Sequence, residues 1–143
     1  MALDLGERRI GVALSDRRRI LASPLTVVLR SGDRAREHAE IRRLVEEAGA
    51  TTVVVGLPLS LSGAAGPAAT RALAEIEELR ELLSVPVVAH DERLSTVEAT
   101  RRLRDTTTAT RNSRSPVKKR RSIVDDKAAA IVLESFLASE PPV

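Results

Sequence analysis

The feature that most constrains the fold is a set of three short apolar runs at the start of the chain, with only polar turns between them. The runs cover residues 2–5, 10–15 and 20–29, and a charged turn at residues 7–9 separates the first two. Runs of this length and spacing predict β-strands that follow one another as a meander. The chain therefore begins with an antiparallel sheet.

After this meander, helical and strand patterns alternate. Ser31 or Asp33 is expected to cap a helix that ends at Gly49, and residues 51–55 form a β-branched run typical of a buried strand. Pro67 fits the first turn of the next helix. The inner face of that helix is expected to consist of apolar residues: Ala69, Ala72, Leu73, Ile76 and Leu83.

The second half of the chain adds one strand and two helices. The strand is expected at about 85–90, and a capping box formed by Ser95 and Glu98 predicts the start of a helix after it. Residues 105–116 are rich in Thr and Ser without periodicity, which predicts a mobile loop. A last helix is expected from about Val117 to Ala138.

Strands that each arrive through a helix are expected to run parallel to the first strand. The predicted fold class is therefore α/β, with a mixed five-stranded central sheet flanked by helices: an antiparallel three-strand meander, then parallel strands. Residues 1–139 are expected to form a single domain, followed by a frayed tail at 140–143. In such sheets, sites form at the C-terminal ends of adjacent parallel strands.

Composition limits the chemistry. The chain has no Cys and only two His, so any metal would be held mainly by carboxylates, which suits Mg²⁺ or Mn²⁺. Phe136 is the sole aromatic residue, which argues against platforms that stack nucleic-acid bases. No basic leader precedes an apolar stretch and no apolar run approaches membrane-spanning length, so a soluble cytoplasmic protein without a membrane partner is expected.

Two acidic positions stand where predicted parallel strands end. Leu3 and Leu5 point to one face of the first strand and Asp4 to the other, where a lone carboxylate is costly unless a cation offsets it. Glu92 follows a strand that could neighbour the first. The ordinary alternative for Asp4 is a turn aspartate that accepts a backbone hydrogen bond. For Glu92 it is an acid that favours the start of a helix. Strand alternation allows only one of the adjacent acids, Asp91 or Glu92, to reach such a site.

A third acidic group lies in the last helix, where Asp125 and Asp126 precede three alanines. Small residues one turn beyond Asp125 would let the helix lie close to the sheet, while Asp126 points more toward solvent. A surface aspartate without a role is the alternative. If Asp4, Glu92 and Asp125 meet, they repel one another unless divalent metal binds them. Two such ions could activate a water and stabilise the leaving oxygen at a phosphodiester.

Basic residues accompany these acids and predict a polyanionic partner. The net charge is +3, and residues 111–121 hold six basic residues and no acid. The alternatives are that Arg93 pairs with a neighbouring acid and that the basic run is only solvated surface. His90 is expected to be a strand-end residue without a chemical role, and His38 to lie on the surface. The candidate phosphate-binding residues are Arg8, Arg93, Lys118, Lys119 and Arg120.

Four segments resemble the signature blocks of the YqgF/RuvX family: ALDLGERRIGVALSD, VVVGLPLSLSG, HDERLSTVEA and VDDKAAAIVLESFL. They occur in the family's order and span residues 2–137. The resemblance implies a ribonuclease H-like fold, a Mg²⁺ or Mn²⁺ requirement and an acidic triad that carries over to Asp4, Glu92 and Asp125. The chain departs from the family in one loop, where Ser60 and Ser62 replace the usual Asn and frequent Asp.

Residues and resemblance together predict a metal-dependent nuclease that hydrolyses phosphodiester bonds in maturation of the 16S rRNA 5′ end. The same chemistry on branched DNA, as a Holliday-junction resolvase, is the first alternative, and its two symmetric cuts would need a dimer. A non-catalytic RNA-binding or transcription-associated factor is the second. The expected partner is RNA, or else branched or single-stranded DNA, bound by a monomer or homodimer. An actin-like phosphotransferase is disfavoured because the chain is too short for two such domains.

Overall fold

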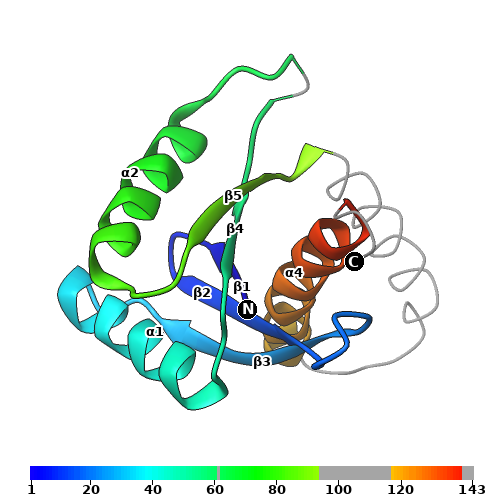
Figure 1. Cartoon of the computed structure of the whole chain (residues 1–143). Helices are drawn as coiled ribbons and strands as arrows, with labels where there is room; N and C mark the ends of the chain where they lie inside the picture. The colour runs from blue at the N-terminus through cyan, green and yellow to red at the C-terminus, as the bar shows by residue number, and fades with distance from the viewer. Residues whose placement is uncertain (61, 94–116, 140–143) are drawn as a thin grey trace.

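A computed structural model describes residues 1–60, 62–93 and 117–139 of the chain, and for residues 117–126 only the backbone (Figure 1). A five-stranded sheet lies at the centre, in the order β3-β2-β1-β4-β5. Helices α1 and α2 cover one face and α4 the other. The bounds of these elements are β1 Ala2–Leu5, β2 Arg9–Ser15, β3 Ala22–Leu29, α1 Arg34–Ala48, β4 Val53–Leu57, α2 Pro67–Leu82, β5 Val87–Asp91 and α4 Val117–Ser139.

The sheet is mixed, as the sequence predicts. Strands β1, β2 and β3 pair antiparallel as a meander, with a register shift between Val12 and Ala13. Strand β4 pairs parallel to β1, and β5 pairs parallel to β4. The parallel strands thus end at the same edge of the sheet, which is where a site is expected.

The two faces of the sheet carry different cores. Large aliphatic side chains such as Leu3 and Ile10 pack with Ile41 of α1 and Ile76 of α2 on one face. Small residues line the other face, where Ala2, Ala13 and Val54 meet α4 through Ala129, Ala130, Val132 and Leu133. Because β1 is covered on both sides, a polar side chain on it is tolerated only near its end.

The helix ends confirm the signals in the sequence. The side chain of Asp33 caps α1 by accepting a hydrogen bond from the Arg36 backbone N–H at 3.2 Å. Gly49 ends the same helix in the left-handed conformation, with φ of 65°. Pro67 opens α2. The strand predicted at 51–55 is β4 and lies two residues later. The strand predicted at about 85–90 is β5, which begins two residues later and ends one residue later.

Two expectations about side-chain placement are wrong. Leu73 is 41% exposed, and its expected place on the inner face of α2 is taken by Glu75, which is only 3% exposed. The buried stripe runs through Ala72, Glu75 and Leu79, at helical spacing, so Leu73 points away. His38 is buried, not on the surface. Its imidazole pairs with the buried Glu75, with Nε2 lying 2.9 Å from Oε1 of that residue.

Several predicted segments lie outside the described residues. These are the helix that the capping box of Ser95 and Glu98 would begin, the loop at 105–116 and the tail at 140–143. Within the part of the chain that is described, no helix is long and apolar enough to span a membrane.

Candidate active site

Strands β1, β4 and β5 bring the candidate acids to one edge of the sheet. Asp4 lies in β1 opposite Gly11 of β2, one residue beyond the last pairing of β1 with β4. Glu92 directly follows β5. The strand before Glu92 does not neighbour β1, because β4 lies between them. A carboxylate at position 92 must therefore cross the end of β4 to approach Asp4.

Gly56 of β4 makes that crossing possible. The backbone N–H of Glu92 donates to the Leu57 carbonyl at 3.1 Å, which holds Glu92 against the end of β4. A Cβ atom on Gly56 would lie 2.0 Å from Oε1 of Glu92, so the Glu92 carboxylate occupies the space of the missing side chain. By strand alternation that space is on the face of Val54, which is also the face of Ala2 and Asp4.

Gly56 was not identified as functional from the sequence, although a signal was present. It directly follows a run of β-branched residues, and glycine inside a strand often marks close approach of another group. The approaching group here is the side chain of Glu92, which directly follows the neighbouring strand β5.

The electrostatics of Glu92 fit a cation site. Burial raises the pKa of Glu92 to about 7, and the nearby charges of Asp4 and Asp91 act in the same direction. Two carboxylates that disfavour each other's ionisation in this way are stabilised when a hard divalent cation binds between them. The residues present therefore fit Mg²⁺ or Mn²⁺, which prefer oxygen ligands.

Asp91 is engaged elsewhere. Its carboxylate accepts hydrogen bonds from Nε of Arg93 at 2.7 Å and from the Arg93 backbone N–H at 2.9 Å. The hydrogen bond from the Arg93 side chain, with that from its backbone, lowers the pKa of Asp91. Of the two adjacent acids, Glu92 rather than Asp91 is thus the one that lies over Gly56.

The third predicted acid is placed only by its backbone. Asp125 lies in α4, one turn before Ala129, which packs on the face of the sheet that carries Asp4. The side chains of Asp125, Asp126, Lys118, Lys119 and Arg120 are not among those described. Among the described side chains, no three His, Cys, Asp or Glu residues are grouped closely enough to hold a metal ion.

A cavity of about 780 Å³ opens beside the acids. Its walls include Asp4, Gly56 and Glu92 on one side, and Arg30, Arg71 and Glu75 on another. This volume lies in the range of pockets that take small molecules, which also suits one nucleotide.

The remaining candidates lie around this edge. Arg8 is exposed in the turn between β1 and β2. The predicted alternative for Arg93 is confirmed, since it pairs with Asp91. Nε2 of His90 lies 2.9 Å from Oγ of Ser135, and the imidazole meets the ring of Phe136 edge-on at 5.8 Å. His90 thus joins β5 to α4.

Comparison with known proteins gives concordant results. The family described as "RuvX: Holliday junction resolvase" matches residues 1–139. A protein of Roseiflexus sp. named "Putative pre-16S rRNA nuclease" is 44% identical over 140 residues, 98% of this chain and 94% of that protein. One of the same name from Streptomyces avermitilis is 41% identical over 141 residues, 98% of this chain and 85% of that protein.

A solved structure supports the fold. The structure titled "T. thermophilus RuvC in complex with Holliday junction substrate" superposes with a TM-score of 0.57, covering 99% of this chain and 96% of that one. The sequence identity is 15%, so this likeness concerns the fold alone. It confirms the predicted ribonuclease H-like architecture.

Proposed function

The chain belongs to the RuvX family, and from this premise we propose that it is a divalent-metal-dependent nuclease that processes the 5′ end of pre-16S rRNA. The observation that carries the proposal is the approach of Glu92 across Gly56 toward Asp4. A buried carboxylate whose pKa is raised to about 7 beside a second acid is the arrangement that a divalent cation stabilises.

In this proposal Asp4, Glu92 and Asp125 hold Mg²⁺ or Mn²⁺. When bound, the metal would supply an activated water and would stabilise the leaving oxygen of the phosphodiester. Asp4 is presented by the end of β1, and Glu92 lies in the space that Gly56 leaves open. Asp125 belongs to the helix that covers the same face of the sheet. The adjoining cavity receives the nucleotide next to the scissile bond.

Basic side chains would hold the phosphates of the substrate strand: Arg8, Arg93, Lys118, Lys119 and Arg120. The Arg93–Asp91 pair is 39% and 38% exposed, respectively, and exposed ion pairs contribute little free energy. Arg93 can therefore exchange Asp91 for a phosphate at little cost. We place the reaction in the cytoplasm, in one domain of residues 1–139 acting as a monomer or homodimer.

The family's own description favours a second candidate, cleavage of branched DNA as a Holliday-junction resolvase. Resolution requires two symmetric cuts and hence two active sites. A protein that stays monomeric by light scattering with the junction bound, and still cleaves pre-16S rRNA, would exclude this candidate.

Asp4→Asn, Glu92→Gln and Asp125→Asn test the active site. Each variant is expected to lose cleavage with Mg²⁺ or Mn²⁺ while still binding nucleic acid, in a panel of pre-16S rRNA, single-stranded RNA and DNA, and a four-way junction. Glu47→Gln, on the exposed side of α1, is the matched control and should cleave normally. Full activity in all three site variants would refute the metal site. A parent protein that binds these nucleic acids but cleaves none of them would instead favour a non-catalytic RNA-binding factor.

A further inference from the structure

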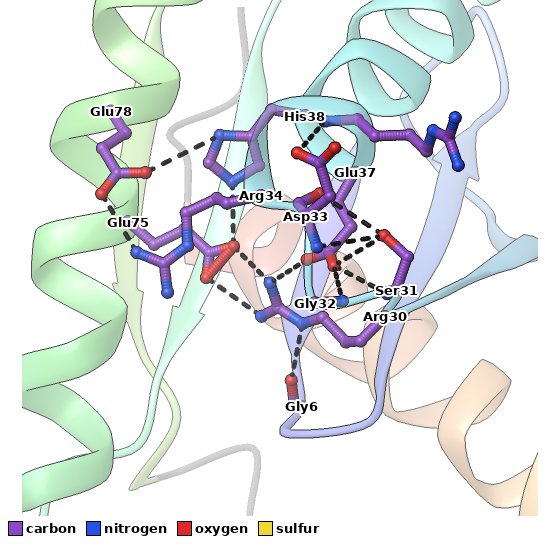
Figure 2. Close-up of polar contacts among 11 residues, drawn as sticks. Gly6, Arg30, Ser31, Gly32, Asp33, Arg34, Glu37, His38, Glu75 and Glu78 are labelled. Atoms are coloured by element: carbon purple, nitrogen blue, oxygen red, sulfur yellow. Dashed lines mark hydrogen bonds and ion pairs between the residues drawn. The ribbon is translucent and has the colours of Figure 1, made fainter.

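A buried group of charged side chains adjoins the proposed site without belonging to the acidic triad. It consists of Arg30, Glu37, His38 and Glu75, here called the Arg30 cluster (Figure 2). Glu37, His38 and Glu75 are each at most 5% exposed. Arg30, Glu37 and Glu75 line the same cavity as Asp4 and Glu92. Nothing in the proposed chemistry uses these groups.

Arg30 joins both helices on its face of the sheet. Its Nη1 and Nη2 atoms donate to the two carboxylate oxygens of Glu75 in α2, at 2.7 and 3.0 Å. Nη1 also donates to Oε1 of Glu37 in α1 at 3.0 Å. Glu37 in turn accepts from the backbone N–H groups of Ser31 and Gly32, at 2.8 and 3.1 Å. The guanidinium plane is thereby fixed by two helices and one loop.

Arg30 also holds the turn that follows Asp4, through its Nε atom and its backbone N–H. Its Nε donates to the Gly6 carbonyl at 3.1 Å, and its backbone N–H donates to the Arg8 carbonyl at 2.9 Å. Gly6 also donates its own N–H to the Arg9 carbonyl at 2.9 Å, and a Cβ on Gly6 would lie 2.6 Å from that oxygen. The turn is therefore tight, and Arg30 holds it through two hydrogen bonds.

That anchor matters because the pairing of β1 with β4 involves Ala2 and Leu3, and Asp4 lies one residue beyond it. Strand pairing restrains Asp4 from the β2 side, through Gly11. We propose that Arg30 is a positioning residue, which fixes the turn after Asp4 against α1 and α2 and so holds the Asp4 carboxylate in register with Glu92 for metal binding. This inference rests on the proposed function of the Asp4–Glu92 site.

The chemistry of the cluster supports a role in orientation. Burial alone would raise the pKa of Glu75, but the hydrogen bonds from His38 and Arg30 outweigh it and hold the pKa at about 2. The hydrogen bond to Glu75 raises the pKa of Arg30. The pair therefore stays ionised throughout the neutral range. Stability alone does not require this, because buried ion pairs can often be replaced by apolar residues without loss. A planar fork bonded to Gly6, Glu37 and Glu75 at once is something only Arg supplies.

The test combines Arg30→Met with Glu75→Gln. This double variant removes the charges of Arg30 and Glu75 and the contact to the Gly6 carbonyl. The glutamine at position 75 retains an oxygen that can accept a hydrogen bond from His38. Arg30→Lys is the conservative partner, which keeps the charge and loses the fork. Arg43→Met is the matched control, since Arg43 also pairs with two glutamates, Glu40 and Glu47, but on the exposed side of α1.

Two readouts separate positioning from stability or substrate binding. Mn²⁺ affinity is measured by calorimetry without nucleic acid, and kcat and KM are measured on pre-16S rRNA, after thermal unfolding has shown that each variant is folded. We expect at least tenfold weaker Mn²⁺ binding and a 10- to 100-fold lower kcat in the double variant, with KM changed less than threefold. Arg30→Lys should fall between this variant and the parent, and Arg43→Met should match the parent.

Parental Mn²⁺ affinity and kcat in a folded double variant would overturn the proposal. So would a loss confined to KM, because Arg30 would then be a substrate contact. The calorimetric arm is independent of the nuclease assignment. If the parent binds Mn²⁺ but cleaves no RNA or DNA, the proposed function fails while the positioning role is still decided by the metal affinities.

Discussion

Gly56→Ala offers the sharpest test of how the site is assembled. A Cβ at this position would lie 2.0 Å from Oε1, 2.8 Å from Cδ and 3.0 Å from Cγ of Glu92. Ordinary van der Waals contact begins at 3.4 Å, so the Glu92 carboxylate must retreat by at least 1.4 Å, the difference between 3.4 and 2.0. The atoms in the way are the end of a flexible side chain, and they can move without disturbing the backbone.

The expected result is a large loss of activity without a loss of stability. Displacing a reacting or metal-holding group by about 1 Å can cost roughly 100-fold in rate, so we expect kcat to fall about that far. Alanine replaces glycine in a strand interior with a gain of roughly 0.5–1 kcal/mol, so the free energy of unfolding should be unchanged or slightly higher. Cleavage of pre-16S rRNA with Mn²⁺ measures the first, and urea unfolding measures the second.

Gly66→Ala is the matched control, because it introduces the same methyl group where nothing lies within 4 Å. Gly66 precedes α2 with φ of −77°, which alanine adopts freely. This control should keep parental activity and lose no more than about 1 kcal/mol of stability. If Gly56→Ala is folded and retains parental kcat and Mn²⁺ affinity, the Glu92 carboxylate does not act from its position over Gly56.

Three further predictions concern stability. The folded-state pKa of Glu75 lies at about 2, below its ordinary 4.5, so its contribution is present above pH 4.5 and is lost as pH falls toward 2. At about 1.4 kcal/mol per pKa unit this amounts to roughly 3.5 kcal/mol. Urea unfolding between pH 6 and 2.5 should therefore show a shallower pH dependence for Glu75→Gln than for the parent, and equal slopes would contradict the assignment. Gly49→Ala places a side chain at φ of 65° and should cost about 1 kcal/mol in the same assay, with activity unchanged. Leu79→Ala empties a fully buried position on α2 and should cost about 2–5 kcal/mol; a loss below 1 kcal/mol would show that the core there is not closely packed.

The architecture was largely predictable because its signals are local. The meander, the Asp33 cap and the Gly49 stop each depend on a few adjacent residues, and each is found in the structure. The acids Asp4 and Glu92 could be picked out because charged residues at strand ends stand out against apolar runs. What no local pattern specifies is which strands are neighbours, and so the insertion of β4 between β1 and the strand before Glu92 was missed.

The Arg30 cluster was missed for a related reason. Glu75 lies 45 residues from Arg30 in the sequence, and Arg30, Glu37 and Glu75 each look like an ordinary surface charge until the fold brings them together. Glu75 did carry a faint signal, because it falls on the apolar stripe of α2 between Ala72 and Ile76. A charge on such a stripe requires a partner. Pairing it with Arg30 needed the tertiary structure.

The order of the segments along the chain has a consequence for synthesis on the ribosome. Strands β1 to β5 and helices α1 and α2 all precede α4, and among the described elements α4 is the one that covers the small-residue face of the sheet. Chains emerge N-terminus first, so α4 cannot pack on this face until that helix has left the exit tunnel. A nascent chain can build the aliphatic core early, whereas the face that carries Asp4 closes only when translation of α4 is complete. A nuclease assembled in this order cannot complete its acidic site before α4 has been synthesised.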